Sequence, residues 1–206
     1  MTEILIEGFN KTIIMVFFST LFSIIIGFIP AIALIVTAPK GLKPNKGVYK
    51  TLDTIINILR GFPFLILMVA IMPLTKLIVG KSIGTTAAIV PLTIAAAPFV
   101  ARIIESALKE VDPGVVEAAK SFGASNTQII FRVMLKEAVP SIISGLTLTI
   151  ISIIGYSAMA GTVGAGGLGD LAVRYGYQRY QTDVMIVTVI ILVVIGRLIT
   201  KKALNK

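Results

Sequence analysis

The sequence predicts an all-α integral membrane protein with about five transmembrane helices, because its apolar residues gather in segments long enough to cross a bilayer. Hydrophobic residues make up 56% of the 206 positions and charged residues only 14%. That composition is too apolar for an ordinary soluble domain. Since the polar joints between the segments are short, we expect residues 1–206 to form a single transmembrane domain.

The first span is expected at residues 12–37, which is long enough to cross the bilayer with some tilt. Gly27 and Pro30 lie inside it and are expected to bend it. The stretch before it is expected to be aqueous. Glu3 and Glu7 in that stretch carry the wrong charge for the start of a secretory signal peptide, so none is expected.

Four further spans follow a loop that carries four lysines and no acidic residue. The second span is interrupted by Arg60, Gly61 and Pro63, which favour a break in the helix. These spans are expected at residues 54–74, 85–104, 141–160 and 184–199.

The longest polar interruption, residues 112–140, carries the start and stop signals of two helices. An Asp-Pro pair opens the first helix as cap and first helical residue. Gly123 ends it, since glycine takes the left-handed conformation without strain. Ser125 and Gln128 form a capping box for the second helix, which Pro140 is expected to end.

The distribution of basic residues predicts the orientation of the chain, because basic residues concentrate on the cytoplasmic side of membrane proteins. With the N-terminus outside and the C-terminus inside, the inner segments hold the loop lysines, the basic residues of the polar interruption and the C-terminal cluster. The outer segments hold only Lys11, Lys76, Lys81, Arg174 and Arg179. This orientation places residues 112–140 in the cytoplasm.

Composition and motif context exclude several function classes. The chain has no cysteine and no histidine, which rules out disulfides, thiolate chemistry and histidine metal ligands, and we expect no metal site. The net charge of +9 suits anionic lipid better than nucleic acid. Gly164, Gly166 and Gly169 match G-x-G-x-x-G, but no strand precedes them and no ribose-binding acid follows. We therefore expect no cofactor and no ATP site on this chain, and no enzymatic activity of its own.

Several residues within or beside the spans are candidates for a solute pathway or gate. Arg60 is an intramembrane charge, which is by default a functional hypothesis, although it could instead reach the inner surface or pair with Asp53. Prolines that break helices at mid-membrane depth also occur where transporters build sites, although they are common as packing kinks. The candidates on these grounds are Arg60, Pro63 and Pro98. Met159 ends the fourth span among small residues and could plug a pore in a symmetric dimer, or could simply pack there. Tyr156 is a further candidate, although it also fits an outer aromatic belt or a partner-docking surface.

The polar interruption also offers a surface to which a partner could dock. Small Ala118 and Ala119 allow close approach, Phe122 offers an anchor, and Glu117 offers one charge that fixes orientation. The alternatives are a solvated loop and a DNA-binding helix-turn-helix. The second is disfavoured, because both ends of the segment enter the bilayer.

Glu117-Ala118-Ala119, followed by Gly123, resembles the EAA motif of binding-protein-dependent ABC importer permeases. The resemblance implies a type I importer permease fold, in which this segment is a cytoplasmic coupling helix seated in a groove of an ATPase subunit. Glu117, Ala118, Ala119, Phe122 and Gly123 would make that contact. The chain departs from the family pattern at residues 135–136, where Leu-Lys replaces Leu-Pro.

Three stretches narrow the resemblance to the permeases of methionine ABC importers: RGFPFLIL, IVPLTIAAAPFVAR and GYSAMAGTVGAGGLG. Phe64 of the first stretch joins the pathway candidates on this ground. The resemblance implies two copies of the chain in a prokaryotic inner membrane, two ATPase subunits that bind ATP and magnesium, and an extracytoplasmic methionine-binding lipoprotein. The solute would be L- or D-methionine. A permease for another small solute and a non-transporting membrane scaffold remain the alternatives.

Overall fold

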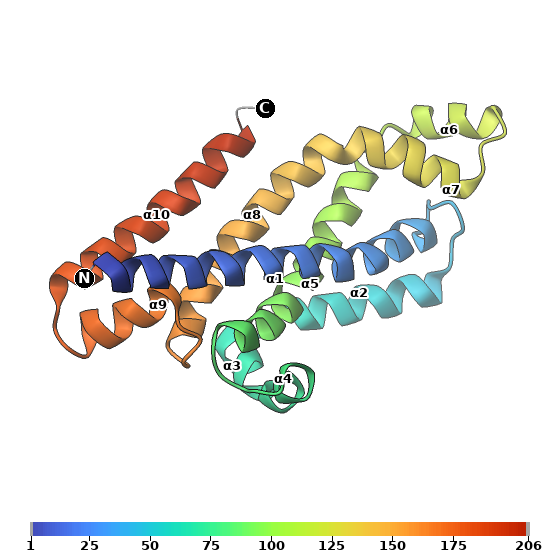
Figure 1. The fold of residues 1–206 in the computed structure, drawn as a ribbon. Coiled ribbons are helices and arrows are strands. Elements are labelled where there is room, and N and C mark those ends of the chain that lie inside the picture. Colours follow the sequence, from blue (N-terminus) through green and yellow to red (C-terminus); the bar gives the residue numbers. More distant parts are fainter. Residues whose placement is uncertain (1, 205–206) are drawn as a thin grey trace.

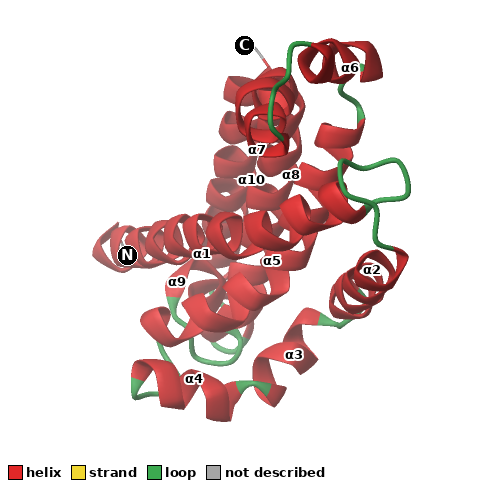
Figure 2. Ribbon diagram, turned by 90° about the vertical axis from the view of Figure 1, so that its right-hand side faces the viewer, coloured by secondary structure: helices red, strands yellow, loops and turns green. Residues whose placement is uncertain are grey.

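The structure of the protein, a computed structural model, describes residues 2–204. In that range its regular secondary structure is entirely helical, and loops join the helices (Figures 1 and 2). Lys206, part of the basic C-terminal cluster, lies outside the described residues. The helices are α1 (Thr2–Thr37), α2 (Lys46–Arg60), α3 (Phe64–Ala70), α4 (Met72–Val79), α5 (Thr85–Lys109), α6 (Pro113–Ser121), α7 (Asn126–Gln128), η1 (Ile129–Met134), α8 (Leu135–Gly161), α9 (Gly167–Leu171), η2 (Ala172–Tyr177) and α10 (Thr182–Leu204).

Helix α1 is helical from Thr2, through the stretch expected to be aqueous, and α9 packs against it at Gly8 and Thr12. The hydroxyl of Thr12 accepts a hydrogen bond from the backbone N–H of Leu168 at 2.9 Å. Further along, Gly27 permits close packing against α5: a Cβ there would lie 2.6 Å from the carbonyl oxygen of Ala97. The helix continues through Pro30 as one element (Figure 1).

The second apolar segment is broken rather than straight. Helices α2 and α3 meet at an angle of 100° across Gly61–Pro63, and α4 then runs on to Gly80. Proline at the junction holds an extended backbone, which ends one helix and starts the next. In the described chain, four helices are long and apolar enough to cross a membrane, and the number reaches five if the bent pair counts as one span.

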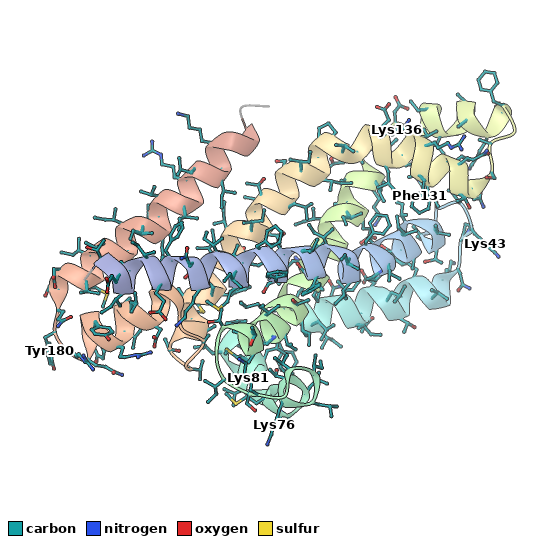
Figure 3. All side chains as sticks on the ribbon, viewed as in Figure 1. Lys43, Lys76, Lys81, Phe131, Lys136 and Tyr180 are labelled. Carbon is teal, nitrogen blue, oxygen red and sulfur yellow. The ribbon has the colours of Figure 1, made fainter. Side chains whose placement is uncertain are left out.

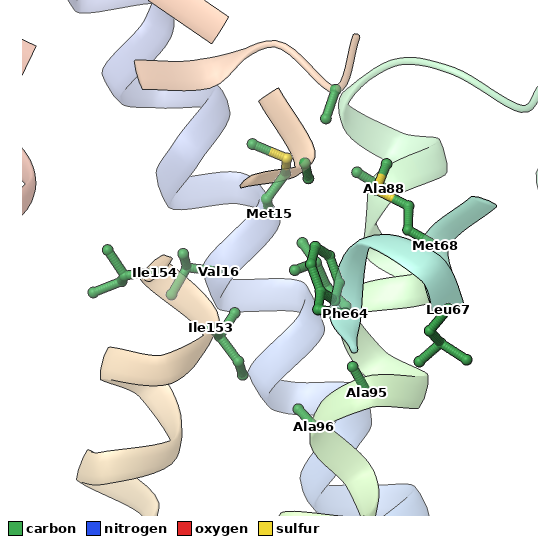
Figure 4. Close-up of a cluster of buried hydrophobic side chains, with 13 residues drawn as sticks. Met15, Val16, Phe64, Leu67, Met68, Ala88, Ala95, Ala96, Ile153 and Ile154 are labelled. Carbon is green, nitrogen blue, oxygen red and sulfur yellow. The ribbon is translucent and has the colours of Figure 1, made fainter. Parts of the chain in front are cut away.

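Helices α1, α5 and α8 pack together and form most of the apolar core. Small residues on α5, among them Ala88, Ala95 and Ala96, are buried in one cluster with side chains of α1, α3 and α8 (Figure 4). In an apolar solvent such close packing is the main attraction between helices. Gly145 of α8 adds a second close approach, since a Cβ there would lie closer than 3.0 Å to Ile103.

The two ends of the molecule carry different elements. Helices α6 and α7 lie at one end, and α9 and η2 lie at the other, beside the N-terminus (Figure 1). Lys43 and Lys136 lie at the α6 end, whereas Tyr180 lies at the α9 end (Figure 3). A displacement of α6 would therefore begin at the end of the molecule opposite α9.

Candidate functional site

Helix α6 begins and ends at the signals that the sequence predicts. The side chain of Asp112 accepts a hydrogen bond from the N–H of Gly114 at 2.7 Å, and Pro113 is the first helical residue. At the other end Gly123 has φ +78°. Its N–H donates to the carbonyl of Lys120 at 2.9 Å, and the next N–H donates to the carbonyl of Ala119 at 3.1 Å. These two bonds form a Schellman motif, which requires the left-handed residue.

The helix after the elbow also starts as predicted, but it does not end at Pro140. Ser125 and Gln128 make both bonds of the capping box, at 2.8 and 3.3 Å. The helical segment then runs without interruption from Asn126 to Gly161, with Pro140 inside it. The expected stop was wrong, because a proline removes a single hydrogen bond and a helix within a membrane span tolerates that loss. The π-helical turn η1 lies just before it and absorbs the change of register.

The predicted contact residues divide between an outer and an inner face of α6. Glu117, Ala118 and Phe122 are exposed, and the ring of Phe122 is 91% accessible. Ala119 is half-buried and packs against the apolar cluster that contains Leu108 and Ile129. An almost fully exposed phenylalanine beside small residues is the arrangement expected of a docking anchor.

A groove of about 500 Å³ lies beside this surface, between α6 and the loop that follows α1. Glu117 and Lys120 line it from α6, and Lys40 and Lys109 line it from the facing elements. The groove therefore combines apolar walls with charges of both signs.

Four of the six pathway candidates, Arg60, Pro63, Phe64 and Tyr156, lie at or against the break between α2 and α3. Phe64, only 6% exposed, is the first residue of α3 and stacks on Tyr156 of α8 with ring centroids 4.8 Å apart and planes within 11° (Figure 4 shows Phe64). Pro63 caps α3 and turns Phe64 inward. Pro98 is buried inside α5, and Met159 lies one turn beyond Tyr156 with 46% of its surface exposed.

Arg60 does not pair with Asp53 in this structure. Its guanidinium lies 5.0 Å from the ring centre of Phe99, whereas Asp53 pairs with Arg102 at 2.7 Å. Phe99 and Tyr156 together line a small cavity of about 90 Å³ between α5 and α8. Sequence reasoning missed Arg102. The sequence does carry a signal for this pairing, because polar residues recur every three or four positions on both α2 and α5.

The glycine-rich stretch after α8 is a packing element. A Cβ on Gly169 would lie closer than 3.0 Å to the backbone of Ala158, so glycine allows α9 to contact α8 directly. Gly164 and Gly166 have positive φ and form the turn between the two helices. Among the described residues, no group of three or more carboxylates is placed to hold a metal ion.

Residues 23–200 match the family described as "binding-protein-dependent transport system inner membrane component". The chain is 50% identical over 198 residues to the "Probable D-methionine transport system permease protein MetI" of Vibrio cholerae, covering 96% of this chain and 88% of that protein. It is 45% identical over 174 residues to the "Methionine import system permease protein MetP" of Bacillus subtilis, covering 81% and 78%.

A solved structure of the MetNI methionine ABC transporter in inward-facing conformations contains a chain that superposes with a TM-score of 0.97. The two chains are 43% identical, and the match covers 100% of this chain and 95% of the other. These likenesses extend over almost the whole chain and agree with the all-helical membrane architecture. The protein belongs to the family of inner membrane components of binding-protein-dependent transport systems.

Proposed function

We propose that this chain is the membrane-spanning subunit of an ATP-driven importer that moves L- and D-methionine into the cytoplasm by alternating access. The observation that carries the proposal is the exposed surface of α6, with Phe122 at its tip, in a chain that is 50% identical to a methionine permease. Two copies of the chain would assemble with two ATPase subunits, which bind ATP and magnesium. An extracytoplasmic lipoprotein would deliver the solute.

The connections of α6 suggest how a movement at the ATPase would reach the pathway. Helix α5 ends at Lys109, shortly before α6, and the long helical segment that includes α8 starts shortly after it. Phe99 of α5 and Tyr156 of α8 line the same cavity. Displacing α6 therefore moves both walls of that cavity, which is the requirement for alternating access.

Reconstitution in proteoliposomes tests the proposal directly. The chain, its ATPase subunit and its binding protein should hydrolyse ATP faster with methionine-loaded binding protein, and labelled methionine should accumulate. Stimulation by a different solute alone would reassign the substrate. An intact complex that no solute stimulates would favour a scaffold over a transporter.

The orientation of the chain in the inner membrane can be read from cysteine labelling, because the chain has no cysteine of its own. We expect Lys43→Cys, at the α6 end, to resist a membrane-impermeant maleimide in whole cells. Gln181→Cys, exposed at the start of α10, should react. Both sites should react after the cells are opened. The reverse pattern in whole cells would place α6 outside, where no ATPase could bind it.

Met159 is expected to help close the outer end of the pathway, because it is half-exposed one turn beyond Tyr156 at the end of α8. Met159→Ala removes a long flexible side chain and leaves small neighbours. Proteoliposomes with this variant should leak methionine without ATP at several times the parent rate. An unchanged leak in a normally assembled complex would make Met159 a packing residue.

A further inference from the structure

A ladder of polar and aromatic side chains joins α2 to α5. Its ends meet features already described, since Lys109 lines the groove beside α6 and Phe99 lines the small cavity, but neither the coupling surface nor the pathway accounts for the members between them. We call this set the α2–α5 ladder. Its members recur at helical spacing on one face of each helix. They are Tyr49, Asp53, Asn57 and Arg60 of α2, and Phe99, Arg102, Glu105 and Lys109 of α5.

The rungs run in order, because the two helices are antiparallel. At the α6 end the hydroxyl of Tyr49 donates to Glu105 at 3.2 Å. In the middle the guanidinium of Arg102 bridges, donating to Asp53 at 2.7 Å and to Glu105 at 2.7 Å. At the other end the guanidinium of Arg60 lies over the ring of Phe99. The ladder thus reaches from the neighbourhood of α6 to a wall of the cavity.

Glu105 is the centre of the ladder and is 0% exposed. Three donors satisfy its carboxylate: Arg102, Lys109 at 2.6 Å, and Tyr49. A buried charge is tolerated only when it is paired in this way, and removing a single partner leaves an uncompensated charge. The carboxylate of Glu105 is therefore fully paired, which closes the network around it, although the Nε–H of Arg102 is buried without a partner.

Apolar contact between α2 and the rest of the chain is limited. Ile56 is its one buried side chain, Tyr49 and Leu52 pack against the same apolar cluster, and Val48, Ile55 and Ile58 are exposed. The ladder therefore adds to a small apolar contact, and we expect its loss to loosen the helix that ends at the break before Phe64.

We propose that the α2–α5 ladder is a rigid strut, with Glu105 as a positioning residue, that makes α2 move with α5 when α6 is displaced. This proposal rests on the proposed import function and adds the element that carries the movement. The alternative for the same contacts is a latch that must open in each cycle. The closed network around Glu105 favours the strut.

A cross-linking rescue separates the strut from the latch. Asp53→Cys with Arg102→Cys removes the central rung, and a short bis-maleimide then rejoins the two helices covalently. Before cross-linking we expect uptake to fall about tenfold while ATP hydrolysis falls less, so that more ATP is used per solute. Cross-linking should restore uptake. Uptake that stays low after complete cross-linking, or a double variant with normal uptake, would overturn the proposal.

Two further measurements cover the case in which the double variant assembles poorly. Spin labels at Thr51 and Ser106, which are exposed and outside the ladder, should keep one distance in the nucleotide-free and ATP-trapped states of the complex. A changed distance would overturn the strut even if import itself is confirmed. Glu105→Gln should raise the ATP used per solute, whereas Lys50→Gln, an exposed change on the same helix, should not. The parent complex is the control for the import function: if it fails to take up methionine, the proposed function fails, and the distance measurement still tests the strut.

Discussion

Uptake is expected to be lost when Gly123 is replaced by valine. Gly123 has φ +78°, and a β-branched residue is strained by about 1–2 kcal/mol in this left-handed conformation. The strain would break the two bonds of the Schellman motif and reorient α6. Nothing lies within 4 Å of an added Cβ, so the strain comes from the backbone conformation. Methionine uptake and pull-down of the ATPase subunit, at matched membrane abundance, measure it.

Ala119→Glu should also abolish uptake, but for a different reason. Ala119 is half-buried against the apolar cluster under α6, and a glutamate would bring an unpaired charge into it. The carboxylate would be driven outward and would tilt α6 away from its seat on the protein.

Lys120→Ala is the matched control for both variants. Lys120 is exposed on the same helix, and the bond that Gly123 makes to it uses only the backbone. Uptake should change little. All three variants should insert normally, since the apolar spans are untouched. Full uptake by both Gly123→Val and Ala119→Glu would show that α6 does not transmit the ATPase stroke.

Gly169→Ala is expected to destabilise the folded chain more than most single substitutions. The added Cβ would lie closer than 3.0 Å to backbone atoms of Ala158, and a backbone cannot move aside as a flexible side chain can. Overpacking of this kind typically costs about 1–3 kcal/mol. Because α9 also contacts α1 through Leu168 and Thr12, the loss should spread to the end of the molecule at which α9 lies.

The measurement is the thermal unfolding midpoint of the purified chain in detergent, compared with that of Gly196→Ala. Gly196 lies in α10 with nothing within 4 Å of an added Cβ, so its variant should unfold at or above the parent temperature. Equal midpoints for the two variants would contradict the close contact between α8 and α9. If Gly164, Gly166 and Gly169 served to bind a nucleotide instead, no difference in unfolding midpoint between the two variants would be expected.

Features that depend on neighbours along the chain could be predicted from the sequence. Each of three such features joins residues no more than five positions apart in the sequence. They are the cap at Asp112, the left-handed turn at Gly123, and the capping box of Ser125 and Gln128. The break at Gly61–Pro63 is local for the same reason. Composition placed the apolar segments, because a bilayer demands about 20 apolar residues per crossing whatever the fold.

Features that depend on what lies opposite a residue were decided by the tertiary structure. Asp53 had Arg60 within reach along its own helix, yet α5 brings Arg102 to 2.7 Å from it. Pro140 carries the signal of a helix end, but the segment continues to Gly161, because a helix in a membrane span can lose one hydrogen bond at a proline and go on. Gly8 and Thr12 of α1 contact α9, more than 150 residues later in the chain. In each case the outcome depends on surroundings that only the folded arrangement creates.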